Sequence, residues 1–92
     1  MIGYLEVDCH IYDTHSLKEK RSVLKRVMNR IRKQFNVTIS ELDYQDLWQR
    51  TLFGIAHVSS SKVKCEKVLQ EVLKEFDQFS ELEVANKQFE WL

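Results

Sequence analysis

The fold is decided within residues 4–19, YLEVDCHIYDTHSLKE, where an alternation of apolar and polar residues is followed by the start of a helix. Residues 2–12 alternate between apolar and polar side chains, which predicts a strand with one buried face. After a turn at residues 13–15, Ser16 and Glu19 match a capping box. The serine hydroxyl can accept from the Glu19 amide, and the Glu19 carboxylate can reach back to the Ser16 amide. We therefore predict a strand, a turn and a helix in that order.

The helix should run from Ser16 to about residue 34, because apolar residues continue at intervals of three, four or seven. These residues are Leu17, Leu24, Val27, Met28, Ile31 and Phe35. FNVTISELD (35–43) then predicts a second strand, and YQDLW (44–48) a connection. Residues 50–59 are apolar on both faces over much of their length, as expected of an interior strand.

Ser60 or Ser61 can cap a second helix, whose buried stripe would run from Cys65 to Phe76. The final segment, ELEVANKQFEWL (81–92), predicts a strand. Its apolar residues change parity between Val84 and Phe89, so we expect a bulge near residues 85–87.

These elements define a single α+β domain over residues 1–92. The order strand–helix–strand–strand–helix–strand, joined by right-handed crossovers, predicts a ferredoxin-like βαββαβ sandwich. Two helices would cover one face of a four-stranded antiparallel sheet and leave the other face open. The first and third strands would be central neighbours.

Composition and sequence pattern limit the cellular compartments in which the protein is expected. The chain has 92 residues, 43% of them hydrophobic, and its 14 basic and 14 acidic residues cancel. No apolar run approaches the roughly 18 residues of a membrane span, and the N-terminus lacks the pattern of a signal peptide. Cys9 and Cys65 lie far apart with no metal-binding spacing, which favours free thiols in the cytoplasm.

The charge is unevenly distributed along the chain. Residues 14–35 hold eight Lys or Arg and one acid, a net charge of +7, and the remaining residues carry −7. A helical wheel places seven of these bases on the exposed side of the first helix: Lys18, Arg21, Lys25, Arg26, Arg30, Arg32 and Lys33. Lys20 falls on the buried side, where its stem could snorkel.

This basic face has three interpretations. It could be an ordinary solvated surface, although exposed helices normally mix both signs of charge. It could bind a polyanion such as RNA through phosphate contacts. It could also pair with the acidic remainder of a second copy.

A second candidate surface combines the open sheet face with the motif at residues 41–50. We expect Tyr4, Phe53 and Ile55 on the open face, together with Trp48, as a dimer surface. Glu6 and Asp8 share the same face and would repel phosphates, which disfavours base stacking there. The motif contributes Glu41, Asp43, Asp46, Trp48 and Arg50. These residues either stabilise a turn and a sheet edge, with Arg50 paired to a carboxylate, or form a protein-binding rim.

Evidence for catalysis is weak. Asp8, His10 and His57 could meet on adjacent strands as a metal cluster, but their spacing matches no known motif, and a surface pair of histidines is favoured. The serines at 59–61 suit helix caps, and no phosphate-binding or metalloprotease motif occurs. We expect a non-enzymatic protein without a cofactor, metal or small-molecule substrate.

Two stretches, SLKEKRS (16–22) and FNVTISELDYQDLWQR (35–50), together resemble the YlxP-like family of small bacterial proteins, a domain of unknown function. The resemblance covers essentially the whole chain and implies a ferredoxin-like fold. Members are commonly encoded beside translation-initiation and ribosome-maturation factors, which implies a role linked to RNA or the ribosome. No catalytic residues follow from it. The leading hypothesis is therefore an RNA- or ribosome-associated protein, and the alternative is a protein–protein adaptor or homo-oligomer.

Overall fold

The computed structural model describes residues 1–92 and contains four strands and two helices. In chain order the elements are β1 (Ile2–Ile11), α1 (Leu17–Gln34), β2 (Thr38–Asp43), β3 (Arg50–Val58), α2 (Lys62–Glu75), a 3-10 turn η1 (Phe76–Gln78) and β4 (Leu82–Trp91). This is the predicted order, and the bounds agree with the predicted ranges except for small shifts at the ends. No helix is long and apolar enough to cross a membrane.

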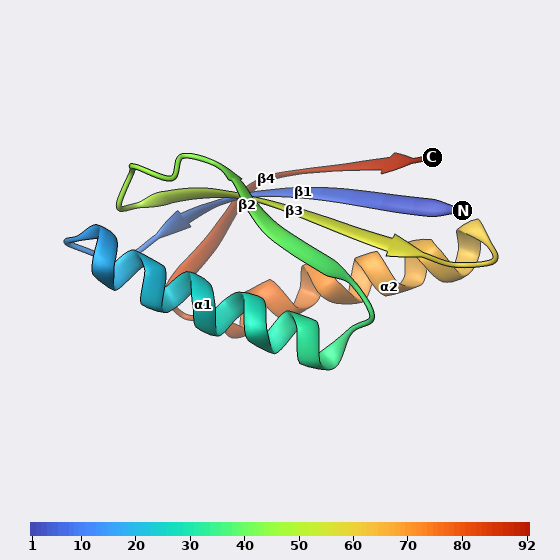
Figure 1. Ribbon diagram of the computed structural model, residues 1–92, viewed down its shortest axis with the longest axis horizontal. Helices are drawn as coiled ribbons and strands as arrows, with labels where there is room; N and C mark the ends of the chain where they lie inside the picture. The colour runs from blue at the N-terminus through green and yellow to red at the C-terminus, as the bar shows by residue number, and fades with distance from the viewer.

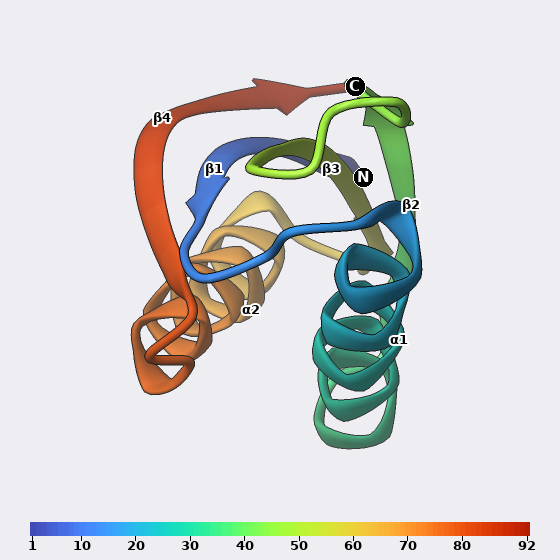
Figure 2. The ribbon, with the colours of Figure 1, turned by 90° about the vertical axis from the view of Figure 1, so that its left-hand side faces the viewer.

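The strands form one antiparallel sheet in the order β2-β3-β1-β4, with β1 and β3 at its centre. Both helices lie on the same face of the curved sheet, and no element covers the opposite face (Figure 2). The predicted ferredoxin-like α+β sandwich is therefore confirmed. The two chain termini lie together at one end of the sheet, and the β2–β3 connection lies at the other end beside the start of α1 (Figure 1).

The core lies between the sheet and the helices because the alternate apolar residues of the strands face the apolar stripes of the helices. Alternate residues of β1, such as Leu5 and Val7, are fully buried, and so are Val27 and Ile31 on α1. Fifteen buried apolar residues from all the strands and both helices form one cluster. Burial of this stripe fixes which side of α1 faces solvent, and hence where its charges lie.

The predicted bulge in β4 is present. Asp8 of β1 lies opposite Asn86, but the next residue, Cys9, lies opposite Val84, so Ala85 has no partner. Because one extra residue reverses the alternation of side chains, apolar residues on both sides of the bulge face the helices.

Both helices begin at serine caps. The Ser16 hydroxyl accepts from the Glu19 amide at 3.1 Å, and the Ser61 hydroxyl accepts from the Lys64 amide at 3.2 Å. The Glu19 carboxylate reaches the His15 amide at 2.8 Å, one residue before the predicted target. The only acid of α1 is thereby engaged at the helix N-terminus, where the helix dipole favours a negative charge.

Candidate nucleic-acid interface

The exposed side of α1 carries the seven predicted bases, which we call the basic face: Lys18, Arg21, Lys25, Arg26, Arg30, Arg32 and Lys33. All seven side chains are exposed. Five of them form no ion pair with an acid of the chain: Lys18, Arg21, Lys25, Arg32 and Lys33. The helix therefore presents unneutralised charge to solvent along its whole length.

Three bases of the face contact neighbouring elements. Arg26 forms an ion pair with Glu81, just before β4. Arg30 contacts Glu75 of α2 at 3.0 Å, and its guanidinium lies 5.1 Å from the centre of the Phe79 ring. Arg32 donates to the Ile39 carbonyl of β2 at 2.9 Å. The Arg26 pair is at the surface, so it contributes about 0–1 kcal/mol and can exchange for a phosphate at low cost. Arg30 and Arg32 bind acceptors of the buried residues Glu75 and Ile39, so the fold partly engages these two bases.

A shallow hollow lies on the basic face near its C-terminal half. Its lining consists of Arg26, Asn29, Arg30, Lys33 and Gln34, with no acidic and no apolar side chain. Guanidinium, ammonium and amide groups all donate hydrogen bonds, and guanidinium groups bind phosphate oxygens in a bidentate manner. The hollow therefore suits an anion better than an apolar ligand.

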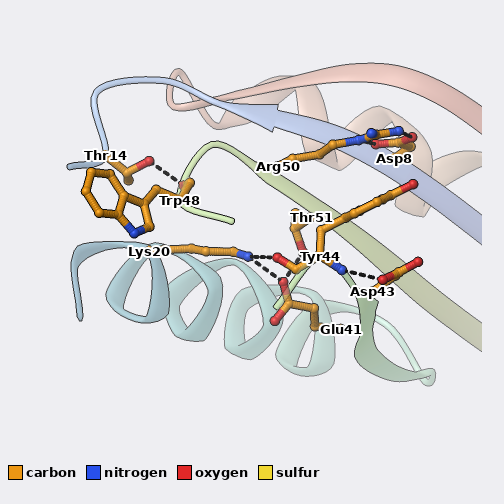
Figure 3. A network of polar contacts seen from close by, with 9 residues as sticks. All are labelled: Asp8, Thr14, Lys20, Glu41, Asp43, Tyr44, Trp48, Arg50 and Thr51. Atoms are coloured by element: carbon orange, nitrogen blue, oxygen red, sulfur yellow. Dashed lines mark hydrogen bonds and ion pairs between the residues drawn. The ribbon is translucent and has the colours of Figure 1, made fainter. Parts of the chain in front are cut away.

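Lys20 is the exception among the bases of α1. Its side chain is 1% exposed, and its ammonium lies 2.9 Å from Glu41 of β2 and donates to the Tyr44 carbonyl at 2.6 Å (Figure 3). The Thr51 hydroxyl also donates to Glu41, at 2.7 Å. Lys20 does not snorkel as expected but forms a buried cross-link between α1, β2 and the β2–β3 connection.

The sequence offered a partial signal for this cross-link. Lys20 falls on the apolar side of the helical wheel, so its charge needed either a route to solvent or a buried partner. Which acid would supply that partner depends on tertiary packing. Glu41, predicted as part of a binding rim, is instead turned inward and committed to Lys20 and Thr51, so it is withdrawn from the candidate interface.

The β2–β3 connection, residues 44–49, is held by its backbone carbonyls. The carbonyls of Tyr44, Trp48 and Gln49 accept from the Lys20 ammonium, the Thr14 hydroxyl and the Ile11 amide, respectively. Tyr44 adopts a left-handed conformation with φ of 65°, and its carbonyl also accepts from the Leu47 amide. The ring of Tyr44 contacts Arg50, but the side chains of Leu47 and Trp48 remain about half exposed.

Arg50 has the carboxylate partner that the sequence suggested. Its guanidinium makes two hydrogen bonds with Asp8, of 2.8 and 3.2 Å, and lies 3.9 Å from the centre of the Tyr44 ring (Figure 3). The hydrogen bond to Asp8 raises the pKa of Arg50. Asp43 and Asp46 are exposed, and Asp43 accepts from the Tyr44 amide at 2.7 Å.

The open sheet face differs from the prediction. Phe53 and Ile55 were expected there but are fully buried against the helices, so they cannot form an interface. The parity of β3 was ambiguous because apolar residues occupy both of its faces. Register shows that Leu52, Gly54 and Ala56 lie on the open side. Trp48 is also not on this face, because it lies beside the first turn of α1 (Figure 3).

Tyr4 does lie on the open face, as predicted. Its hydroxyl donates to the Glu6 carboxylate at 2.7 Å. Partial burial, together with this bond and the charge of Glu6, raises the pKa of Tyr4 to about 12. The acids on this face, including Glu6 and Asp8, make it unsuitable for phosphates.

The possible metal cluster does not form. His10 lies on the open face, whereas His57 faces the helices, and its Nδ1 lies 2.7 Å from the Asn36 carbonyl. No group of three or more His, Cys, Asp or Glu residues is placed to hold a metal ion. Cys9 and Cys65 are both buried free thiols, and burial raises the pKa of Cys9 to about 12.

The geometry defines a small α+β domain of ferredoxin-like topology with a basic helix on its surface. Comparison with known proteins assigns it to a family: residues 2–89 match the model of a protein family of unknown function, DUF503, and the chain belongs to that family. It is 58% identical over 91 residues to the uncharacterised protein YlxP of Bacillus subtilis strain 168, covering 99% of each chain. The family resemblance seen in the sequence is therefore confirmed.

Proposed function

We propose that this protein is a non-enzymatic RNA-binding protein that contacts phosphates through the basic face of α1. The observation that carries the proposal is the set of exposed bases on α1, of which five have no acidic partner in the chain: Lys18, Arg21, Lys25, Arg32 and Lys33. Concentrated, unneutralised charge of one sign is the usual footprint of a nucleic-acid site.

The arrangement suits a structured RNA more than a specific base sequence. Contacts to phosphates fix position and orientation but carry little sequence information. The bases follow one another along α1, which is 18 residues long and therefore spans about 27 Å. A helix of this length can follow the backbone of a folded RNA over several successive phosphates.

The family resemblance further narrows the proposed target. Because it implies a link to translation and ribosome maturation, we place the target among ribosomal RNAs or their precursors, in the cytoplasm. Two free cysteines accord with a reducing compartment.

Sedimentation of the tagged protein with ribosomal particles from lysate tests the proposal. A triple variant, Lys18→Glu, Arg21→Glu and Lys25→Glu, removes unpaired bases and leaves every ion pair intact. The matched control, Lys64→Glu, Lys67→Glu and Lys74→Glu, changes three exposed lysines of α2 and lowers the net charge by the same amount.

We expect the wild type and the α2 variant to migrate with a ribosomal subunit at low salt and to be released at high salt. The α1 variant should stay at the top of the gradient. Migration of all three proteins at the top, in either salt, would contradict the proposal.

A homodimer formed through the open sheet face is a second candidate. Ile2 and Val58 are directly paired across β1 and β3, and both are exposed, Val58 to 69%. The exposed side chain of Leu42 lies over Gly54 on the same face. An isologous interface brings one patch against its own copy, which an uncharged patch permits. Sedimentation equilibrium should then give a dimer that Val58→Glu converts to a monomer, and a monomeric wild type would exclude it.

A further inference from the structure

Trp48 is the side chain whose position the fold explains least. It is 48% exposed, although tryptophan is normally well buried. The fold uses its backbone, because its carbonyl accepts from the Thr14 hydroxyl at 2.6 Å. Its indole ring takes part in no aromatic pair or cation–π contact of the chain. The ring is therefore available to a ligand.

The indole is presented on a fixed support. Lys20, itself buried, binds the Tyr44 carbonyl, and the Ile11 amide binds the Gln49 carbonyl. The backbone is thus held at Trp48 itself, at Tyr44 before it and at Gln49 after it. A fixed backbone loses little conformational entropy on binding, which favours the use of Trp48 as a contact residue.

These contacts place the indole at the end of α1 where the basic face begins. Figure 3 shows the ring at the N-terminal end of α1 beside Thr14, on the side of the helix from which Lys20 extends. Lys18 belongs to the first turn of α1, and Arg21 and Lys25 follow on the same flank, each about one turn further along the helix. An aromatic ring and the first of a row of unpaired cations therefore lie at the same end of α1, the ring on the Lys20 side and the cations on the exposed side.

An aromatic side chain beside a basic track is the combination by which proteins hold unpaired nucleotides. Resting on the function proposed above, we propose that Trp48 stacks an unpaired RNA base whose neighbouring phosphates bind Lys18, Arg21 and Lys25. The preferred ligand is then an RNA helix interrupted by an unpaired nucleotide. Exposed Asp46 lies in the same connection and repels phosphates, so the backbone runs on the α1 side of the ring.

The experiment compares two synthetic RNA hairpins that differ only by a single bulged nucleotide in the stem. Affinities are measured for the full-length wild type, Trp48→Ala and Trp48→Phe, with a melting temperature for each protein. All three should be folded at the assay temperature, with Trp48→Ala melting somewhat lower, because the indole is about half exposed and the bond to Thr14 uses the backbone. A fourth protein, Trp91→Phe, leaves Trp48 as the only tryptophan of the chain and reports stacking by fluorescence.

We expect the wild type to bind the bulged hairpin about 5- to 150-fold more tightly than the uninterrupted one. Trp48→Ala should lose that preference while still binding both hairpins, and Trp48→Phe should retain most of it. The fluorescence of Trp48 should be quenched by the bulged hairpin alone.

Two results would overturn the inference, and they differ in what they say of the proposed function. If Trp48→Ala prefers the bulged hairpin as strongly as the wild type does, Trp48 stacks no base, and the exposed ring is left for a protein partner. In that case binding through the basic face still stands. If the wild type binds neither hairpin at low salt, both the inference and the proposed function fail.

Discussion

The two helices perform the same structural task with very different charges. Both begin at a serine cap, lie on the same face of the sheet and bury an apolar stripe in the same core. α2 mixes four lysines with three glutamates, whereas α1 carries eight bases and one acid. A helix in this layer can thus be built with nearly balanced charge, so the excess on α1 is not a requirement of the fold.

Lys20 is the one base of α1 that the fold does use. Lys20→Ala would leave Glu41 and the Tyr44 carbonyl without their buried partner, so we expect a loss of about 3–5 kcal/mol in the free energy of unfolding, measured by urea denaturation. Lys18→Ala, an exposed base in the same turn, should change it by less than about 0.5 kcal/mol. Equal effects of the two substitutions would erase the distinction between structural and surplus bases on α1.

The contact of α2 with β1 gives the next largest effect. A Cβ at Gly3 would lie 2.6 Å from the Cys65 sulfur and 2.8 Å from Leu69, both fully buried on α2. Gly3→Ala should therefore lower the free energy of unfolding by about 1–3 kcal/mol.

Gly54→Ala is the matched control on the open face. Its Cβ would meet the end of Leu42, which is exposed and can move aside, so we expect a change within about 0.5 kcal/mol by the same urea measurement. A cost at Gly54 as large as that at Gly3 would mean that the open face is packed as tightly as the helix face.

Alkaline pH should produce a smaller, gradual loss in the free energy of unfolding, through the buried thiol of Cys9. Burial raises the pKa of Cys9 from its ordinary value of 9.0 to about 12, so the folded state retains the proton longer. The contribution of this thiol is complete below about pH 9 and is lost as pH rises toward 12. Urea midpoints between pH 8 and 11 should fall for the wild type and fall less steeply for Cys9→Ala. Parallel curves would show that Cys9 does not titrate in this way.

Much of the fold was predictable because local rules and burial agree. The alternation in residues 2–12, the capping box at Ser16 and the parity change in residues 81–92 each determine one element without reference to the rest. Phe53 and Ile55 were misplaced because β3 is apolar on both faces, and only pairing with β1 identifies the buried one.

The candidate site was predictable only where charge alone matters. A helical wheel suffices to expose the basic face, since burial of the apolar stripe leaves no other direction for those side chains. The partners of Lys20 and Arg30 come from segments at least 21 residues away and depend on how α1 packs against β2 and α2. The position of Trp48 likewise depends on the bond from Thr14, which no sequence pattern indicates.

The central claim is that the surplus charge of α1 binds RNA, and the salt dependence of binding tests it most directly. Affinity for a structured RNA would be measured from low to high salt for the wild type and for the two triple variants of α1 and α2. We predict a steep decline for the wild type and the α2 variant, and a slope smaller by about two to three for the α1 variant, near one unit per lost phosphate contact. If the α1 and α2 variants show the same affinity and the same slope, the basic face is not the RNA site.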